Sequence, residues 1–137
     1  MDKQEREPPI PAFAKGEVFA LLDDSQSSGE WWASRLFLNP REIIECHSPD
    51  QADACFEKVA AGLAWGLRAI GLFGYELGYC LEAGLSKIER RDASAPLFTI
   101  VLFKECRRLT SEQSSALIRD HLDPAAPAAF HALRPSL

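Results

Sequence analysis

Short apolar runs separated by turn-forming residues make up the first third of the chain. Residues 17–22 form an apolar run of strand length, and residues 23–29, which follow, are dense in Asp, Ser and Gly. Two further runs, 34–38 and 42–46, flank Asn39-Pro40, where proline fixes φ and removes a ladder donor. This pattern predicts one strand followed by a β-hairpin.

Two segments carry the pattern of a helix N-terminus. Ser48-Pro-Asp-Gln51 and Thr110-Ser-Glu-Gln113 each place a hydroxyl three residues before a glutamine, which is the spacing of a capping box. The second helix is expected to stop at Asp123-Pro124. The first is expected to face a sheet with apolar residues at three-to-four spacing, namely Ala52, Cys55, Phe56, Val59, Leu63, Gly66, Leu67 and Ile70.

The remaining apolar segments predict further strands and one short helix. Residues 69–75 contain two glycines and are expected to form a central strand. Residues 75–82 are expected to form a short helix that ends at Gly84. Residues 97–103 form an uninterrupted apolar run, and 106–109 could pair with it after a tight turn. This order predicts an α+β fold with a mainly antiparallel sheet covered by helices.

Composition fits one folded domain with polar ends. The 137 residues are 47% hydrophobic, enough for a chain of this length to bury about two-thirds of its unfolded surface. We expect a flexible arm at 1–12, a folded domain at 13–122 and a Pro/Ala-rich linker at 123–137. The net charge is −5, and the basic residues come in separated pairs, which disfavours nucleic-acid binding.

Several other classes of protein are disfavoured as well. There is no apolar signal region and no run of about 20 apolar residues, so we expect a cytoplasmic protein that does not insert into a membrane. The Gly71-x-x-Gly74 segment lacks the basic residue of a phosphate loop. No C-x-x-C pair or clustered histidines suggest a metal, so we expect free thiols and isolated imidazoles at Cys46, Cys55, Cys80, Cys106, His47, His121 and His131.

Few side chains in the sequence occur in a pattern that is typical of catalytic residues. Asp23 and Asp24 are adjacent at a strand end and would point to opposite faces, so they cannot serve one atom as acid and base. Turn chemistry, with Ser25, is the simpler expectation. Glu76 is expected to cap a helix, and Tyr75 either anchors the core or meets a ligand.

Trp65 lies off the apolar stripe of the first helix. It either packs on a loop or, with Trp31 and Trp32, forms a surface for another domain.

The segment Gly71-Leu-Phe-Gly-Tyr-Glu-Leu-Gly-Tyr-Cys80 resembles the G-[YF]-x-[SG]-Y-E-x-G-Y segment in the N-terminal region of aminodeoxychorismate synthase component I, the large subunit of para-aminobenzoate synthase. The related anthranilate synthase component I shares it. Residues 19–25, 35–44 and 96–105 are similar to other segments of that region, in the same order. The likeness spans residues 17–109 and favours aminodeoxychorismate synthase at the Tyr75-Glu76 and Asp23-Asp24 positions.

The resemblance implies a non-catalytic segment of an enzyme that converts chorismate to 4-amino-4-deoxychorismate in folate biosynthesis. The family's catalytic lysine and acidic magnesium ligands have no counterpart here, so no cofactor is expected in this chain and Mg belongs to the parent enzyme. The implied partners are a chorismate-binding catalytic domain, for which 123–137 looks like the connecting linker, and a glutamine amidotransferase subunit. Such N-terminal regions form part of a two-sheet structure, which predicts an uncovered apolar face.

The resemblance also suggests a ligand pocket. In the family the turn after Leu-Leu often reads Glu-Ser and helps to hold tryptophan, whereas here the same turn reads Asp-Asp-Ser. A carboxylate there could still meet an ammonium group. The alternative function is a stand-alone module that binds an aromatic amino acid or docks on another chain without catalysis. The candidate ligand-binding residues are Leu22, Asp23, Asp24, Ser25, Tyr75 and Glu76.

Overall fold

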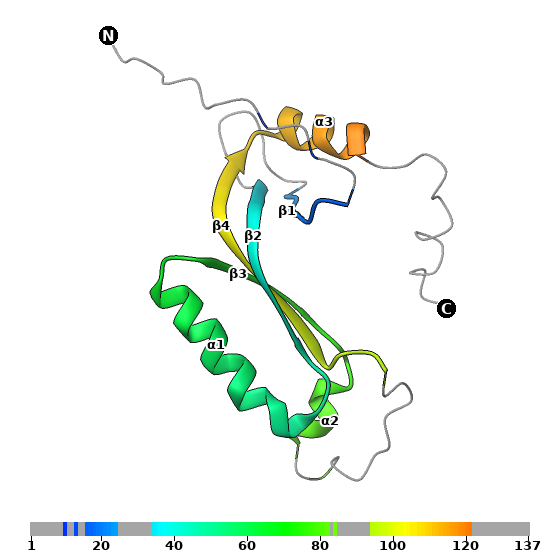
Figure 1. Cartoon of the computed structure of the whole chain (residues 1–137). Coiled ribbons are helices and arrows are strands. Elements are labelled where there is room, and N and C mark those ends of the chain that lie inside the picture. The colour runs from blue at the N-terminus through cyan, green and yellow to red at the C-terminus, as the bar shows by residue number, and fades with distance from the viewer. Residues whose placement is uncertain are drawn as a thin grey trace, which may run out of the picture.

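The computed structural model describes residues 10, 13, 16–24, 34–82, 84 and 94–121. These residues confirm an α+β fold in which an antiparallel, curled, four-stranded sheet of half-barrel shape carries three α-helices (Figure 1). The strand order is β1-β2-β4-β3. The elements are β1 (Ala20–Leu22), β2 (Ser34–Cys46), the 3₁₀ turn η1 (Pro49–Gln51), α1 (Ala52–Ala64), β3 (Arg68–Phe73), α2 (Leu77–Leu81), β4 (Phe98–Leu109) and α3 (Ser111–His121).

The strands β2 and β4 each run without reversal through a position where the sequence predicted a turn. The hairpin prediction at Asn39-Pro40 is wrong, because β2 runs through it and pairs with β4 from Ser34 opposite Leu109 to Cys46 opposite Phe98. Asn39 adopts a left-handed φ of 57°, and the register shifts between Pro40 and Glu42. The chain bulges there instead of reversing. The predicted turn between 103 and 106 is wrong for the same reason, since β4 is continuous.

The glycine-containing strand lies at the edge of the described sheet, so its predicted central position is wrong. β3 pairs with β4 and with no other described strand. The chain then turns at Gly74, whose N–H donates to the carbonyl of Leu97 at 2.8 Å. A β carbon at Gly74 would lie 3.1 Å from that same oxygen. The short helix predicted after this turn is confirmed as α2.

Helix α1 packs on one face of the sheet (Figure 1). Its contact side consists of small residues, with Cys55 and Gly62 buried and Val59 half-buried. The predicted apolar stripe is confirmed at Ala52, Cys55 and Val59. Leu63 is instead 50% exposed, and Phe56 reaches the sheet only by stacking on Phe98 at 4.9 Å between ring centroids. The last part of the predicted stripe is wrong, because α1 ends at Ala64 and Ile70 belongs to β3. The core beneath α1 consists of Ile44, Cys46, Cys55, Leu97, Phe98, Ile100 and Leu102.

A second core lies at the other end of the sheet. Leu36, Leu38 and Leu109 pack there with Leu117 of α3. Leu102 and Leu109 differ by an odd number of positions along β4, so they point to opposite faces of the sheet. The two helices α1 and α3 therefore cover opposite faces at opposite ends of the β2–β4 ladder.

The two predicted capping boxes have different outcomes. The one before α3 is confirmed, because the Thr110 N–H donates to Oε1 of Gln113 at 2.9 Å and the Gln113 N–H donates to Oγ1 of Thr110 at 3.2 Å. Before α1 the helix forms as predicted, but Ser48 makes no capping bond through its side chain. Its hydroxyl hydrogen-bonds the Asp50 carboxylate instead, which lowers the pKa of that group.

Candidate docking face and polar clusters

The predicted ligand-binding residues fall into two groups that the structure does not bring together. Leu22 ends β1 and lies opposite Arg35, which in turn lies opposite Arg108 of β4. Phe73, two residues before Tyr75, lies opposite Phe98 at the other end of β4. At about 3.3 Å per residue, the ten positions between these ends of β4 span roughly 30 Å. One pocket cannot use both groups directly, and Ser25 lies outside the described residues.

Asp23 joins three elements through a buried polar cluster. Its Oδ1 accepts hydrogen bonds from the hydroxyl of Ser34 on β2 at 2.9 Å and from the hydroxyl of Ser114 on α3. The Ser34 oxygen in turn accepts the N–H of Asp24 at 3.0 Å. Both serines are fully buried, so Asp23 supplies the acceptor that their hydroxyls need inside the protein. No local pattern signals this cluster, because Ser114 lies 91 positions from Asp23.

Tyr75 and Glu76 lie in the turn before α2. Tyr75 is 86% exposed, so the expectation that it anchors the core is wrong, and its ring meets that of Tyr79 edge-on at 5.8 Å. Glu76 occupies the N-cap position of α2, as predicted, but its side chain makes no capping hydrogen bond. An exposed phenol beside a half-buried carboxylate places two hydrogen-bonding groups at this corner of the sheet.

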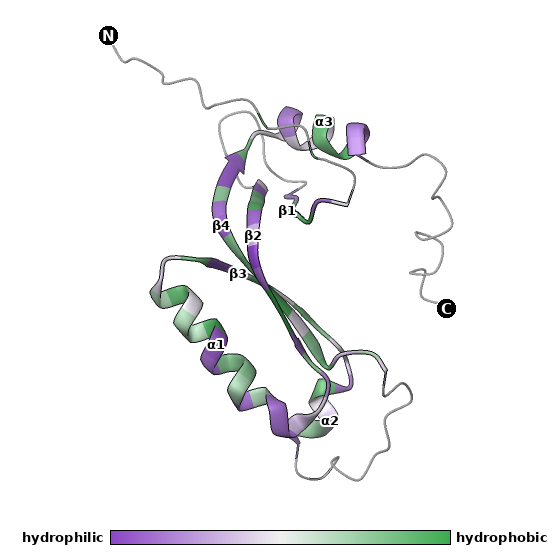
Figure 2. Ribbon diagram, viewed as in Figure 1, coloured by the Kyte–Doolittle hydropathy of each residue, from purple (hydrophilic) through white to green (hydrophobic). Residues whose placement is uncertain are grey.

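Within the described residues, the sheet face opposite α1 carries a partly exposed apolar row, in which Val101 and Ile70 are half-buried. Ile43, Val101 and Ile70 lie side by side across β2, β4 and β3, on the face away from the buried side chain of Ile44. Ile43 is 52% exposed. Leu72, on the same face of β3, is 73% exposed. Figure 2 shows that this half of the sheet is mostly hydrophobic, whereas hydrophilic residues dominate the part of β4 that leads to α3.

The apolar row continues to the edge of β3. This edge has no partner among the described strands, so it offers backbone N–H and C=O groups for pairing. Phe73, which ends β3, and Tyr75, in the turn that follows, are exposed, as is Leu81 at the end of α2. We call Ile43, Ile70, Leu72, Val101 and the free edge of β3 the docking face.

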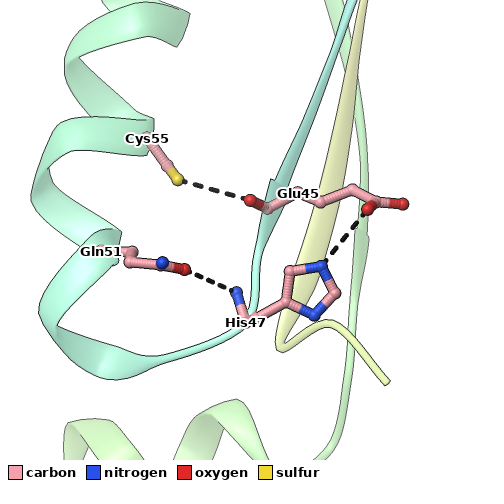
Figure 3. A network of polar contacts seen from close by, with 4 residues as sticks. All are labelled: Glu45, His47, Gln51 and Cys55. Atoms are coloured by element: carbon pink, nitrogen blue, oxygen red, sulfur yellow. Dashed lines mark hydrogen bonds and ion pairs between the residues drawn. The ribbon is translucent and has the colours of Figure 1, made fainter. Parts of the chain in front are cut away.

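A polar network closes the junction of β2 and α1 (Figure 3). The His47 N–H donates to Oε1 of Gln51 at 3.2 Å, and its imidazole Nε2 lies 3.3 Å from the Glu45 carboxylate. The Cys55 thiol points to the carbonyl of Glu45 at 3.8 Å. These contacts hold the short connection from β2 through η1 to α1 in place, although the Ser48 side chain makes no capping bond.

The buried free thiols of Cys46 and Cys55 lie beside each other. Burial and the adjacent thiol of Cys55 raise the pKa of Cys46 above its ordinary value, so Cys46 is a neutral thiol at neutral pH.

Within the described residues, no three His, Cys, Asp or Glu side chains gather as a metal site would require. None of the described helices is both long enough and apolar enough to span a membrane.

Comparisons with known proteins add no relative to these observations. No family model, no curated protein and no solved structure matches the chain.

Proposed function

We propose that this chain is the N-terminal, non-catalytic segment of an aminodeoxychorismate synthase component I-like enzyme, and that its docking face packs against the chorismate-binding catalytic domain. The observation that carries the proposal is the partly exposed apolar row in the described part of a half-barrel whose edge strand β3 is also unpaired among the described strands. The choice of partner, a chorismate-binding catalytic domain, rests on the four segments that resemble the family's N-terminal region in the same order. The finer architecture, one half of a two-sheet chorismate-utilising enzyme, is part of this proposal.

The size of the patch sets how the two parts would associate. Fully burying an aliphatic side chain contributes about 1.5–3 kcal/mol, so covering the exposed parts of Ile43 and Leu72 contributes roughly 2–4 kcal/mol. Association of separate molecules costs several kcal/mol in lost motional freedom. The docking face would therefore bind a separate catalytic domain weakly and a tethered one well, since a tether replaces the bimolecular step by a local one.

In this proposal the chain shapes and supports the enzyme, while the chemistry belongs to its partners. The catalytic domain would bind chorismate and hold Mg, and the glutamine amidotransferase subunit would supply ammonia. Tryptophan would be a ligand only of the β1 end, around Leu22 and Asp24, because Tyr75 and Glu76 lie about 30 Å away along the sheet. There one oxygen of Asp23 is already occupied by two hydroxyls.

The proposal is tested by mixing the chain with a separately produced chorismate-binding domain of an aminodeoxychorismate synthase. Sedimentation velocity measures association, and conversion of chorismate to 4-amino-4-deoxychorismate with added ammonia measures assembly of an active enzyme. We expect association and a gain in conversion. Leu72→Lys and Ile43→Lys should abolish both, whereas Leu63→Lys, a matched change on the half-exposed side of α1, should abolish neither.

Three results would count against this function. The first is no association at concentrations up to about millimolar, the range that short tethers provide. The second is an equal effect of all three lysine substitutions. The third is tight binding of tryptophan by the unassembled chain together with no effect of the catalytic domain, which would favour the stand-alone amino-acid-binding module instead.

A further inference from the structure

We propose that a two-cation hollow at the β2 bulge binds a small aromatic carboxylate. The hollow has a volume of about 470 Å³ and is lined by Arg41, Trp65, Gly66, Leu67 and Lys104. None of these five residues is acidic, although the chain carries a net charge of −5. We call this set the cationic hollow.

The bulge creates the cationic side of the hollow. Because Asn39 is left-handed and the register shifts between Pro40 and Glu42, Arg41 is the extra residue of β2. On β4, Lys104 lies between Phe103 and Glu105, opposite the left-handed Asn39. Two long basic side chains therefore leave the ladder at the same place.

The end of α1 creates the aromatic side. Gly66 has a left-handed φ of 84°, its N–H donates to the carbonyl of Leu63, and the Leu67 N–H donates to the carbonyl of Gly62. This pair of bonds is a Schellman motif, which fixes the chain direction at the helix end. The motif holds Trp65 at the rim of the hollow with 87% of its surface exposed. Trp65 is thus exposed to solvent at this turn and packs neither in the core nor on a loop. Trp31 and Trp32, which the sequence grouped with it, lie outside the described residues.

No acidic side chain among the described residues pairs with the two cations. Arg41 and Lys104 make no hydrogen bond or ion pair within the described residues. Glu105, the acid that follows Lys104, accepts a hydrogen bond from the Asn39 amide at 3.0 Å and pairs with Arg107. Glu17 borders an adjoining hollow of about 690 Å³ that shares both cations, and it already has a partner other than those two residues.

This combination of groups matches one class of ligand. A guanidinium binds a carboxylate through two parallel hydrogen bonds, an ammonium adds a point charge, and an exposed indole stacks on a flat ring. The volume falls in the usual range of about 300–1,000 Å³ for small-molecule sites and suits a single-ring acid. Lys104 shares the β4 face of Leu102, which α1 covers, so the hollow lies on the side away from the docking face and does not depend on the proposed function.

The test is an NMR titration of the ¹⁵N-labelled chain with benzoate, with Trp65→Phe used to assign the indole N–H signal. We expect saturable shifts of the Trp65 indole signal, and affinity at least tenfold lower for the neutral analogue benzamide. Arg41→Gln and Lys104→Gln should each lower the affinity about tenfold, the usual effect of losing one charge-assisted hydrogen bond. Arg35→Gln, the same charge change at the far end of β2, should leave the affinity unchanged.

Each other outcome overturns the assignment. Equal binding of inorganic phosphate would make the hollow a general anion site with no role for the indole. Equal binding of the amide would remove the role of the cations. An equal effect of Arg35→Gln would show that binding depends only on the net charge of the chain. No shift of the Trp65 signal at millimolar benzoate would show that the hollow does not bind this class of ligand. The dispersion of the backbone amide signals in each variant reports whether it is folded.

Discussion

Replacing Gly62 by alanine measures how tightly α1 is packed on the sheet. A β carbon at this position would lie 2.5 Å from Cδ1 and 3.4 Å from Cδ2 of Leu102. Carbon atoms normally approach to about 3.5–4.0 Å, so the first contact is short by roughly 1 Å. Leu102 has no exposed surface into which it could turn. The added methyl group must therefore push the helix or the leucine away.

Two opposing effects determine the change in the free energy of unfolding. Alanine in a helix interior is better than glycine by about 1 kcal/mol, and overpacking a core costs about 1–3 kcal/mol. The net expectation for Gly62→Ala is a loss of roughly 1 kcal/mol. Gly78 provides the control, because it lies in α2 and an alanine β carbon there would meet no atom within 4 Å. Gly78→Ala should be stabilising by up to about 1 kcal/mol.

The assay is urea unfolding followed by circular dichroism, with the slope m checked for constancy. The double variant Gly62→Ala/Leu102→Val removes both Cδ atoms, so it should cost less than the sum of the single changes, with a coupling of roughly 1 kcal/mol. The reasoning fails if Gly62→Ala stabilises the chain as much as Gly78→Ala does, or if the double variant is additive.

Three further predictions concern buried and strained positions. Asp23→Ala leaves the buried hydroxyls of Ser34 and Ser114 without their acceptor, so urea unfolding should show a loss of about 2–4 kcal/mol, and Asp23→Asn, which keeps an oxygen, should lose less. Asn39→Ala should cost about 1–2 kcal/mol because of its left-handed φ, whereas Asn39→Gly should cost less; equal costs would contradict this. The folded state raises the pKa of Cys46, so the thiol ionises at lower pH in the unfolded chain than in the folded one. The free energy of unfolding should therefore fall as pH rises above about 8.5, and Cys46→Ala should make that fall smaller.

Local sequence signals located the helices well. The Thr110–Gln113 capping box forms as the sequence predicts, and helix α1 begins after Ser48 although other side chains take over the capping. These signals succeed because a helix terminus is decided by residues within about four positions of one another.

Strand layout was predicted less well because it depends on partners far away in the sequence. Asn39-Pro40 carries the same local preferences whether the chain turns or bulges, and the long pairing with β4 selects the bulge. The position of β3 at the edge likewise depends on which strand β4 accepts on each side. An apolar run indicates a buried or paired strand, but it does not indicate which other strand is its partner.

The candidate sites divide in the same way. The sequence identified Asp23 and Trp65 as unusual, but it could not show that Asp23 meets Ser114 or that Trp65 stands beside Arg41 and Lys104. Both groupings arise only once β2, β4 and the helices are in place. The tripeptide Asn39-Pro40-Arg41 is a local signal that could have pointed to the cationic hollow, because asparagine tolerates a left-handed φ and the arginine follows at once.

The two separate cores have a consequence for how the molecule opens. The cluster under α1 and the cluster under α3 share no residue, and within the described chain the long β2–β4 ladder runs from one to the other. Local unfolding follows such cooperative units, so each end can lose its helix while the other keeps its amides protected from hydrogen exchange. The bulge at Asn39 lies between them, at the point where the ladder is already interrupted. The β2–β4 ladder therefore connects two small cooperative units, and the bulge is the place where it is expected to bend.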